Sequence, residues 1–254
     1  MSWRAENPQI EGRSPEDFAK RLCGKSTDLR MRLVVLAAHP DDETIGASAL
    51  LARYPQSAVI YMTDGAPRER RFWPPDMQGE RERYADLRRS EASKALAQAG
   101  IAADQIVWLG AVDQEAAFEM PTLIGGFRDL LNAIRPDAVI THPYEGGHPD
   151  HDAAALVARF AIDGIDRKMR PELLEMTSYH SREGRCVTGE FLDSSPQHEA
   201  VLEFTEGDRE RKRNMFRQYA SQQLVLDNFS IACERIRRLL PADQGFGERP
   251  LLRC

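Results

Sequence analysis

Short apolar runs alternate with helical patterns along much of the chain, and this alternation restricts the fold more than any other feature. Each run is continuous, as is typical of a strand buried on both faces, and apolar residues at helical spacing follow it. Such alternation predicts a parallel sheet built through right-handed crossovers, with helices on both faces. The predicted strands are residues 31–37, 58–63, 105–109 and 137–141, and the predicted helices between them are 43–54, 87–99 and 123–134.

We therefore predict an α/β fold with a Rossmann-like, doubly wound, mostly parallel sheet. Because no linker, internal repeat or low-complexity tract divides the chain, residues 1–254 are predicted to form a single domain. Residues 1–29 are expected to carry a short leader helix, and the core is expected to span about 31–222. The later part is predicted to contain strands at 172–179 and 200–204 and helices at 208–222 and 231–239.

Composition indicates a globular protein that acts on small molecules. With 42% hydrophobic residues, 29% charged residues and a net charge of −6, the chain has no global attraction to nucleic acid or to an anionic membrane. Residues 1–30 lack the apolar core of a signal peptide, and no apolar run is long enough to span a membrane, so we expect a cytoplasmic enzyme. The four cysteines show no C-x-x-C spacing, which argues against a zinc ribbon and a thioredoxin-like motif.

Two clusters of histidine and carboxylate residues follow predicted strands. Residues 37–43 read Ala-Ala-His-Pro-Asp-Asp-Glu, and residues 148–151 read His-Pro-Asp-His. Because the carboxyl ends of parallel strands meet at one edge of a sheet, we expect the clusters to hold one metal ion together. The alternative is that the carboxylates of the first cluster only cap the following helix. Four of the six histidines lie in or beside the clusters, which favours the metal site: His39, His142, His148 and His151.

These motifs resemble the PIG-L/LmbE family of zinc-dependent N-acetylglucosaminyl de-N-acetylases. The two clusters stand in the family's order, each after a strand, and they are the specific part of the match. The resemblance implies the Rossmann-like fold and a hydrolase that removes acetyl from an N-acetylglucosamine-type conjugate. Weaker matches are Thr63-Asp64-Gly65, the pair Arg88 and Glu91, Leu109-Gly110 with Asp113, and Lys212 with Tyr219 to Gln222.

The resemblance also implies a metal centre. His39, Asp42 and His151 are its expected ligands, and Asp41 is expected to stay off the metal as the general base that activates a metal-bound water. Zinc is the expected ion. Ferrous iron is the alternative, because two histidines and one aspartate also suit it.

His148 and Asp150 are the other expected catalytic residues. His148 is expected to donate a hydrogen bond to the oxyanion, while the carboxylate of Asp150 accepts from the other ring nitrogen of His148. Either Asp41 or His148 can return the proton to the leaving amine. A purely structural role for His148 is the alternative.

Arg88, Asp113 and Tyr144 are the expected substrate contacts. The first two match family positions that contact the sugar, although Arg88 can instead form a solvated ion pair with Glu82 or Glu91. Where one branch of the family has a tyrosine, this chain has Gly146, and Tyr144 is the residue that can reach the same space.

Alternatives also stay open for two segments of the chain, for the overall function and for the oligomeric state. Residues 68–73 either bind an anionic or aromatic portion of the substrate or form a mobile lid. Lys212 and residues 219–222 are expected to pack near the rim of the site. The alternative functions are a metal-dependent phosphoesterase, which usually needs two bridged ions, and a non-catalytic metal-binding protein of the same fold. The oligomeric state stays open.

Overall fold

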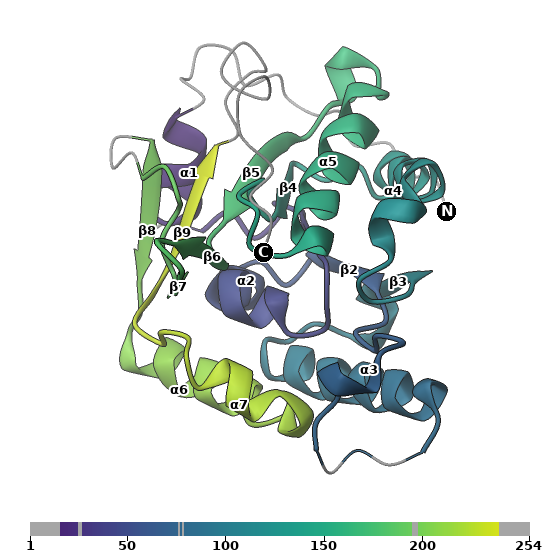
Figure 1. Ribbon diagram of the computed structural model, residues 1–254. Helices are drawn as coiled ribbons and strands as arrows, with labels where there is room; N and C mark the ends of the chain where they lie inside the picture. Colours follow the sequence, from purple (N-terminus) through teal and green to yellow (C-terminus); the bar gives the residue numbers. More distant parts are fainter. Residues whose placement is uncertain (1–15, 25–26, 76, 78, 195–197, 239–254) are drawn as a thin grey trace.

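A seven-stranded sheet forms the centre of the computed structural model, which describes residues 16–24, 27–75, 77, 79–194 and 198–238 (Figure 1). The strand order is β3-β2-β1-β4-β5-β9-β8. The first five strands are parallel, and β9 runs antiparallel to both β5 and β8. The predicted Rossmann-like, mostly parallel sheet is thus confirmed. The strands are β1 (Leu33–Ala37), β2 (Ala58–Thr63), β3 (Ile106–Ala111), β4 (Ala138–Thr141), β5 (Glu172–Met176), β8 (Glu199–Glu203) and β9 (Cys233–Arg238).

Helices cover both faces of this sheet because its central strands are apolar on both sides. Leu33, Val35 and Ala37 of β1 join one hydrophobic core, and the alternate residues Val34 and Leu36 join the other. The first core lies under α1, α2, α3 and α6, and the second lies under α4 and α5. The helices are α1 (Glu16–Leu22), α2 (Asp42–Arg53), α3 (Arg81–Gln98), α4 (Met120–Ile134), α5 (Pro149–Asp163), α6 (Glu206–Phe216) and the short α7 (Gln223–Leu226).

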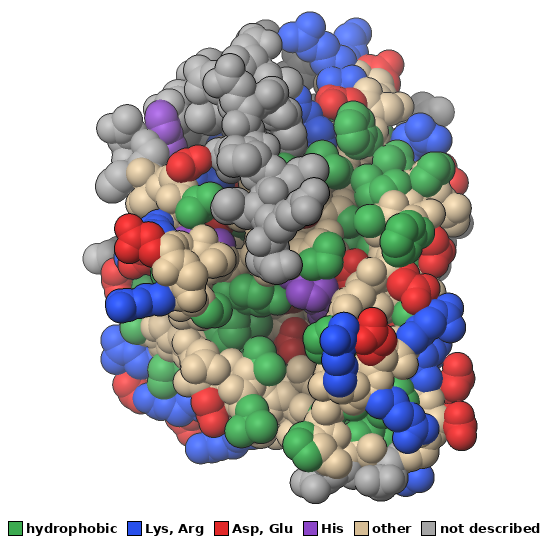
Figure 2. Space-filling view, in the orientation of Figure 1, with side chains coloured by type: hydrophobic (Ala, Val, Ile, Leu, Met, Phe, Trp, Pro, Cys, Tyr) green, Lys and Arg blue, Asp and Glu red, His purple; other side chains and the backbone are tan. Residues whose placement is uncertain are grey.

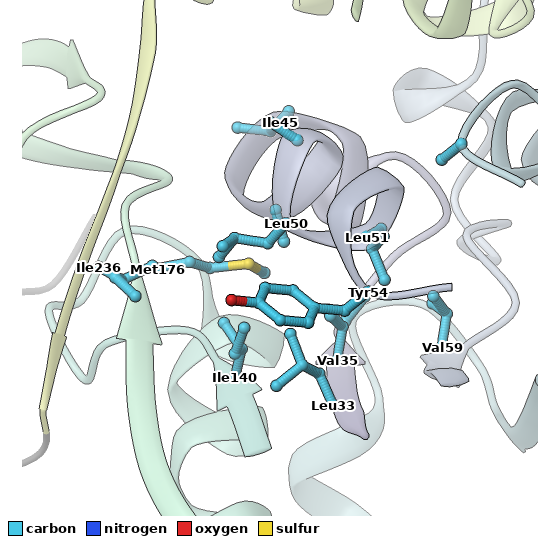
Figure 3. Close-up of a cluster of buried hydrophobic side chains, with 14 of the residues drawn as sticks. Leu33, Val35, Ile45, Leu50, Leu51, Tyr54, Val59, Ile140, Met176 and Ile236 are labelled. Atoms are coloured by element: carbon cyan, nitrogen blue, oxygen red, sulfur yellow. The ribbon is translucent and has the colours of Figure 1, made fainter. Parts of the chain in front are cut away.

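The first core packs α2 tightly against the sheet. Figure 3 shows Leu50 of α2 beside Met176 of β5, with Ile140 of β4 in the same cluster. Gly46 permits this approach, since a Cβ at this position would lie 2.6 Å from the Sδ atom of Met176. Leu50 is fully buried, and truncating such a leucine to alanine typically costs about 2 to 5 kcal/mol. The start of α2, which carries the first motif, is therefore held on a rigid element.

The predicted helix over residues 231–239 is wrong in the part that the structure describes. Residues 233–238 form β9, in which Glu234 and Ile236 are buried and the other four residues are half-buried. Because charged residues occupy most positions of β9, its alternation of buried and half-buried residues does not appear as an alternation of apolar and polar residues in the sequence. Glu234 is tolerated inside because the hydroxyl of Ser48 donates to it at 2.6 Å and the Nζ atom of Lys212 lies 3.6 Å away. Lys212 is itself buried and also donates to the carbonyl oxygen of Ile45 at 2.6 Å.

Other boundaries differ from the predictions in smaller ways. The predicted strand 172–179 is divided into β5 and a hairpin of β6 (Tyr179–Arg182) and β7 (Arg185–Thr188). The predicted helix 208–222 ends at Phe216, and a 3-10 turn follows at Ala220–Gln222. The leader helix is α1, while residues 1–15 lie outside the described part. Within that part, no helix combines the length and the apolar character needed to cross a bilayer.

Candidate active site

The two motifs meet where the connections of the sheet change direction. β1 and β4 are neighbours, but the connection after β1 leads to β2 on one side and the connection after β4 leads to β5 on the other, so the loops after β1 and β4 flank a crevice. The His39 ring of the first motif lies 4.6 Å from the His148 ring and 5.3 Å from the His151 ring, between ring centroids. The predicted meeting of the two clusters is confirmed.

Asp42 lies at the centre of this cluster. Its Oδ2 atom is 3.4 Å from Nδ1 of His39, and its Oδ1 atom is 3.3 Å from Nε2 of His151. Burial alone would raise the pKa of Asp42, but the neighbouring imidazoles of His151 and His142 hold it well below its usual range. Burial lowers the pKa of His151 to about 3. An ionised carboxylate beside a neutral imidazole is the ligand state that a divalent cation requires.

The surrounding donor set fits a metal ion. Nitrogen atoms of His39, His148 and His151 lie within 4.8 Å of one another, and so do donor atoms of Asp42, His142 and His151. The Nε2 atom of His151 is buried and makes no hydrogen bond of good geometry among the described residues, although Oδ1 of Asp42 lies 3.3 Å away. Such an unpaired buried nitrogen is what a metal ligand presents before the ion binds.

His142 supports the cluster, a role that the sequence did not assign to it. Its ring is fully buried and stacks on the His151 ring at a centroid distance of 3.9 Å. The Nε2 atom accepts a hydrogen bond from the backbone N–H of Ala38 at 3.1 Å. The same nitrogen lies 3.3 Å from Oδ2 of Asp42, so His142 packs against both the His151 ring and the carboxylate at the centre of the cluster. Its place directly after a predicted strand was the available signal.

Asp41 is a buried carboxylate beside the cluster. It immediately precedes α2, has a φ angle of 135°, and is 6% exposed. Its Oδ2 atom accepts a hydrogen bond from Nη2 of Arg88 at 3.2 Å. Burial raises the pKa of Asp41 to about 7, although Arg88 opposes the shift. A carboxylate with such a pKa can accept a proton at neutral pH and return it, as a general base requires.

His148 and Asp150 do not pair in the predicted way. His148 caps the N-terminus of α5, and its Nδ1 atom accepts the backbone N–H of Asp150 at 3.2 Å. The carboxylate of Asp150 instead lies 3.1 Å from Nε2 of His39 and accepts the backbone N–H groups of Gln114 and Ala116. The predicted contact between this carboxylate and the His148 ring is therefore wrong. Asp150 orients His39, because it points toward the loop after β3.

The crevice holds a pocket whose lining includes His39, Asp41 and His148, and the His148 ring offers an N–H hydrogen-bond donor there. Burial lowers the pKa of His148 to about 4, so the ring is neutral at neutral pH. Since Nδ1 accepts a hydrogen bond, Nε2 carries the proton. The ring lines the pocket beside His39 and Asp41, in reach of a group bound there.

Arg88 and Asp113 both line this pocket, and their contact with a substrate stays a prediction. The guanidinium of Arg88 is 3% exposed and donates from Nη2 to the carbonyl oxygen of Pro40 at 2.6 Å. Its burial makes the alternative of a solvated surface pair wrong. The Nε and Nη1 atoms of Arg88 are buried and have no partner among the described residues. Asp113 lies 3.2 Å from Nε2 of His39.

Tyr179 stands where Tyr144 was expected. Tyr144 is not among the described residues that line the pocket, whereas Tyr179 is, and its ring packs edge-on against His151 at 5.0 Å. Tyr179 opens β6 shortly after β5, the neighbour of β4, and it is the last residue of the predicted strand 172–179; this place at the end of a predicted strand was the signal that could have identified it.

The loop before α3 forms one wall of the pocket. Trp73 is buried, donates its indole N–H to the carbonyl oxygen of Pro67 at 2.7 Å, and packs on Tyr84. These contacts anchor the loop and argue against a freely solvated lid. Figure 2 shows histidine and acidic side chains at the bottom of a hollow with hydrophobic side chains beside it. Two half-exposed apolar side chains line the pocket: Phe72, which is 48% exposed, and Val225, which is 47% exposed.

The fold and the site together define a Rossmann-like α/β protein with a histidine and aspartate cluster at its switch point. The family model of PIG-L, described as GlcNAc-PI de-N-acetylase, matches residues 34–162, about half of the chain. The chain belongs to the PIG-L family. The matched segment contains both histidine motifs.

Relatives with known names share this segment. A mycothiol S-conjugate amidase of Streptomyces coelicolor is 27% identical over 173 residues, which cover 59% of this chain and 58% of the relative. A 1D-myo-inositol 2-acetamido-2-deoxy-alpha-D-glucopyranoside deacetylase of Geodermatophilus obscurus is 29% identical over 166 residues, 56% of each chain. The chain thus spans just over half the length of these relatives.

Solved structures share the fold over a longer stretch. The zinc-inhibited form of the teicoplanin deacetylase Orf2 superposes with a TM-score of 0.61 at 17% identity, covering 85% of this chain and 100% of that one. At this identity the likeness establishes the fold alone, because one fold can host many activities.

Proposed function

We propose that the protein is a metal-dependent hydrolase that removes an acetyl or similar acyl group from the amide nitrogen of an N-acetylglucosamine-type conjugate. The observation that carries the proposal is the position of Asp41, a buried carboxyl that lines the pocket beside the His39, Asp42 and His151 cluster. The family and the named deacetylase relative support the same reaction.

The proposed metal ligands are His39, Asp42 and His151. Zinc is the proposed ion, with ferrous iron as the alternative for the same donor set. A bound divalent ion would polarise the amide carbonyl and lower the pKa of water at the site. The buried, neutral Nε2 atom of His151 and the ionised Asp42 fit such an ion.

The surrounding residues have distinct roles in the proposed hydrolysis. Asp41 takes a proton from the attacking water, and the Nε2–H group of His148 donates to the oxygen of the tetrahedral intermediate. Asp150 holds the His39 ring in orientation through its 3.1 Å contact. Because the His148 ring is neutral, the proton that Asp41 has taken from the water is the one that goes to the leaving amine.

The pocket favours a substrate whose second portion lies at the mouth. Its volume of about 170 Å³ is below the range of about 300 to 1,000 Å³ that is typical for drug-sized ligands. The reacting amino-sugar end fits inside, with Arg88 and Asp113 as its proposed polar contacts. The remainder of the conjugate must rest on Phe72 and Val225, so we propose that it presents an apolar or aromatic surface there.

The two-ion phosphoesterase is less well supported. The additional donor group of His39, Asp113 and Asp150 shares His39 with the main cluster, so it is an alternative arrangement and not a separate second site. The carboxylate of Asp150 is also occupied by the backbone N–H groups of Gln114 and Ala116. One ion per chain is therefore the proposed content.

Acetate release from a panel of N-acyl amino sugars tests the proposal. The panel contains methyl, octyl and p-nitrophenyl N-acetylglucosaminides, with p-nitrophenyl phosphate added for the phosphoesterase alternative. The purified protein is loaded with zinc or ferrous iron, and metal content is measured in parallel. Release of acetate from any glycoside supports the deacylase, whereas phosphate release alone would assign the phosphoesterase. Stoichiometric metal binding without turnover on the whole panel would favour the non-catalytic alternative.

A further inference from the structure

A segment outside the family-matched residues 34–162 makes a buried contact with Glu43 of the first motif. Tyr219 lies between α6 and the 3-10 turn Ala220–Gln222, and its hydroxyl donates to Oε1 of Glu43 at 2.5 Å. The neighbouring Ser221 donates to the carboxylate of Glu91 on α3 at 2.6 Å, so the segment is fixed on two helices. Tyr219 is fully buried, which excludes direct contact with solvent.

Glu43 is bonded at both carboxylate oxygens. Its Oε1 atom also accepts the hydroxyl of Thr44 at 2.6 Å, and its Oε2 atom accepts the backbone N–H of Asp41 at 3.1 Å. The side chain is 0% exposed. A carboxylate that only capped the helix could remain in solvent, whereas a buried one is stable only when its bonds are satisfied. The burial of Glu43 therefore needs a reason beyond capping.

Glu43 is buried where it holds the unusual backbone conformation of Asp41. Its φ of 135° and ψ of −25° lie in a region that residues other than glycine rarely adopt. Such a conformation persists only when the surroundings determine it. Here the N–H of Asp41 is held by Glu43, and its carbonyl oxygen accepts the N–H groups of Thr44 and Ile45 at 2.9 and 3.0 Å.

This conformation separates two adjacent carboxylates. The side chain of Asp42 turns to the imidazoles of His39 and His151, whereas that of Asp41 turns to Arg88. We propose that Glu43 and Tyr219 are positioning residues, which act through the backbone N–H of Asp41 to keep its carboxylate off the metal cluster and at the pocket. The role of Asp41 as base rests on the proposed function.

Three variants separate positioning from packing. Glu43→Met removes the acceptor, Glu43→Gln keeps an oxygen that can face the Asp41 N–H, and Tyr219→Phe removes the donor that fixes the carboxylate. Tyr54→Phe is the matched control, because the buried Tyr54 also donates one hydrogen bond, to the carbonyl oxygen of Leu22 at 3.3 Å, away from the site.

We expect kcat for acetate release to fall about tenfold or more in Glu43→Met and Tyr219→Phe, since small misplacements of a catalytic group are costly. KM and metal content stay near the wild-type values, and Glu43→Gln and Tyr54→Phe retain most of the activity. If Tyr219 acts through Glu43, the double variant Glu43→Met with Tyr219→Phe is no slower than Glu43→Met alone.

Hydrogen exchange of the Asp41 backbone amide, followed by NMR, gives a readout that does not depend on turnover. It is expected to accelerate in Glu43→Met and Tyr219→Phe and to stay unchanged in Tyr54→Phe. Wild-type kcat and unchanged exchange in Tyr219→Phe would overturn the positioning role, and that variant suffices should Glu43→Met fail to fold. A wild-type protein that releases no acetate overturns the proposed reaction, while the exchange data still decide the role of Glu43.

Discussion

Replacing Asp41 by asparagine isolates the proton-accepting function of this side chain. Asparagine has nearly the same shape and, like aspartate, tolerates positive φ angles, so it can keep the backbone at φ 135°. Its side-chain oxygen can still accept the hydrogen bond that Arg88 donates at 3.2 Å. Alanine would be a poorer probe, because it would lose this bond as well as the base.

The expected loss follows from the lost proton transfer. General-base catalysis typically contributes about 10² to 10⁴ in rate, which corresponds to about 3 to 5 kcal/mol of transition-state stabilisation. Folding should suffer less, because Nη2 of Arg88 keeps its 2.6 Å bond to the carbonyl oxygen of Pro40. We expect the free energy of unfolding at pH 7 to change little, because the raised pKa of Asp41 means that the folded protein already disfavours its ionised form, which a neutral asparagine avoids.

Two measurements on Asp41→Asn test whether Asp41 acts as a base and not as a metal ligand. Steady-state acetate release gives kcat and KM, and elemental analysis after gel filtration gives the metal content. Asp42→Asn is the matched control, because it changes the neighbouring carboxylate that contacts His39 and His151 and should lower metal content as well as activity. Wild-type kcat in Asp41→Asn, or loss of metal in this variant alone, would refute the separation of base from ligand.

Three further predictions concern the metal, the loop and the pocket mouth. Chelation should abolish acetate release and lower the melting temperature, since free ion at 100 times its Kd stabilises by about 2.7 kcal/mol; zinc should restore both, and unchanged melting would argue against the site. Gly147→Ala should lower stability to urea and kcat, because its Cβ would lie 2.1 Å from the carbonyl oxygen of Tyr179; wild-type stability would contradict this contact. Phe72→Ser and Val225→Ser should each lower kcat/KM about five- to thirtyfold for the octyl glycoside and leave the methyl glycoside unchanged, as expected for about 1 to 2 kcal/mol of lost apolar burial; equal effects on both glycosides would contradict the apolar mouth.

The parallel half of the sheet could be predicted because its strands are buried on both faces. Strands such as Leu33–Ala37 and Ala58–Thr63 are fully buried and therefore read as continuous apolar runs. β9 has the sequence CERIRR, in which long charged side chains occupy half-buried positions. Its strand character depends on partners elsewhere in the chain, such as Lys212 for Glu234, so a local hydrophobicity pattern cannot detect it.

The site could be predicted as far as the topology determines it. Motifs at the ends of β1 and β4 must meet, and this places His39 near His148 and His151. Which atoms then pair depends on loop conformations that no spacing encodes. Asp150 turns to His39 because backbone N–H groups of the loop after β3 hold its carboxylate, and Tyr179 enters the pocket because a hairpin follows β5.

Asp41 and Asp42 show how far tertiary contacts determine chemistry. The two residues are identical and adjacent, yet the pKa of one is raised to about 7 and that of the other is held well below its usual range. Burial alone would raise the pKa of both carboxyls. The pKa of Asp42 is lowered instead because the imidazoles of His151 and His142 lie beside it. Carboxylates whose pKa values are driven apart in this way commonly divide the roles of proton acceptor and permanent anion. The division between base and ligand is thus produced by elements remote in sequence, which bring their side chains to opposite sides of one turn.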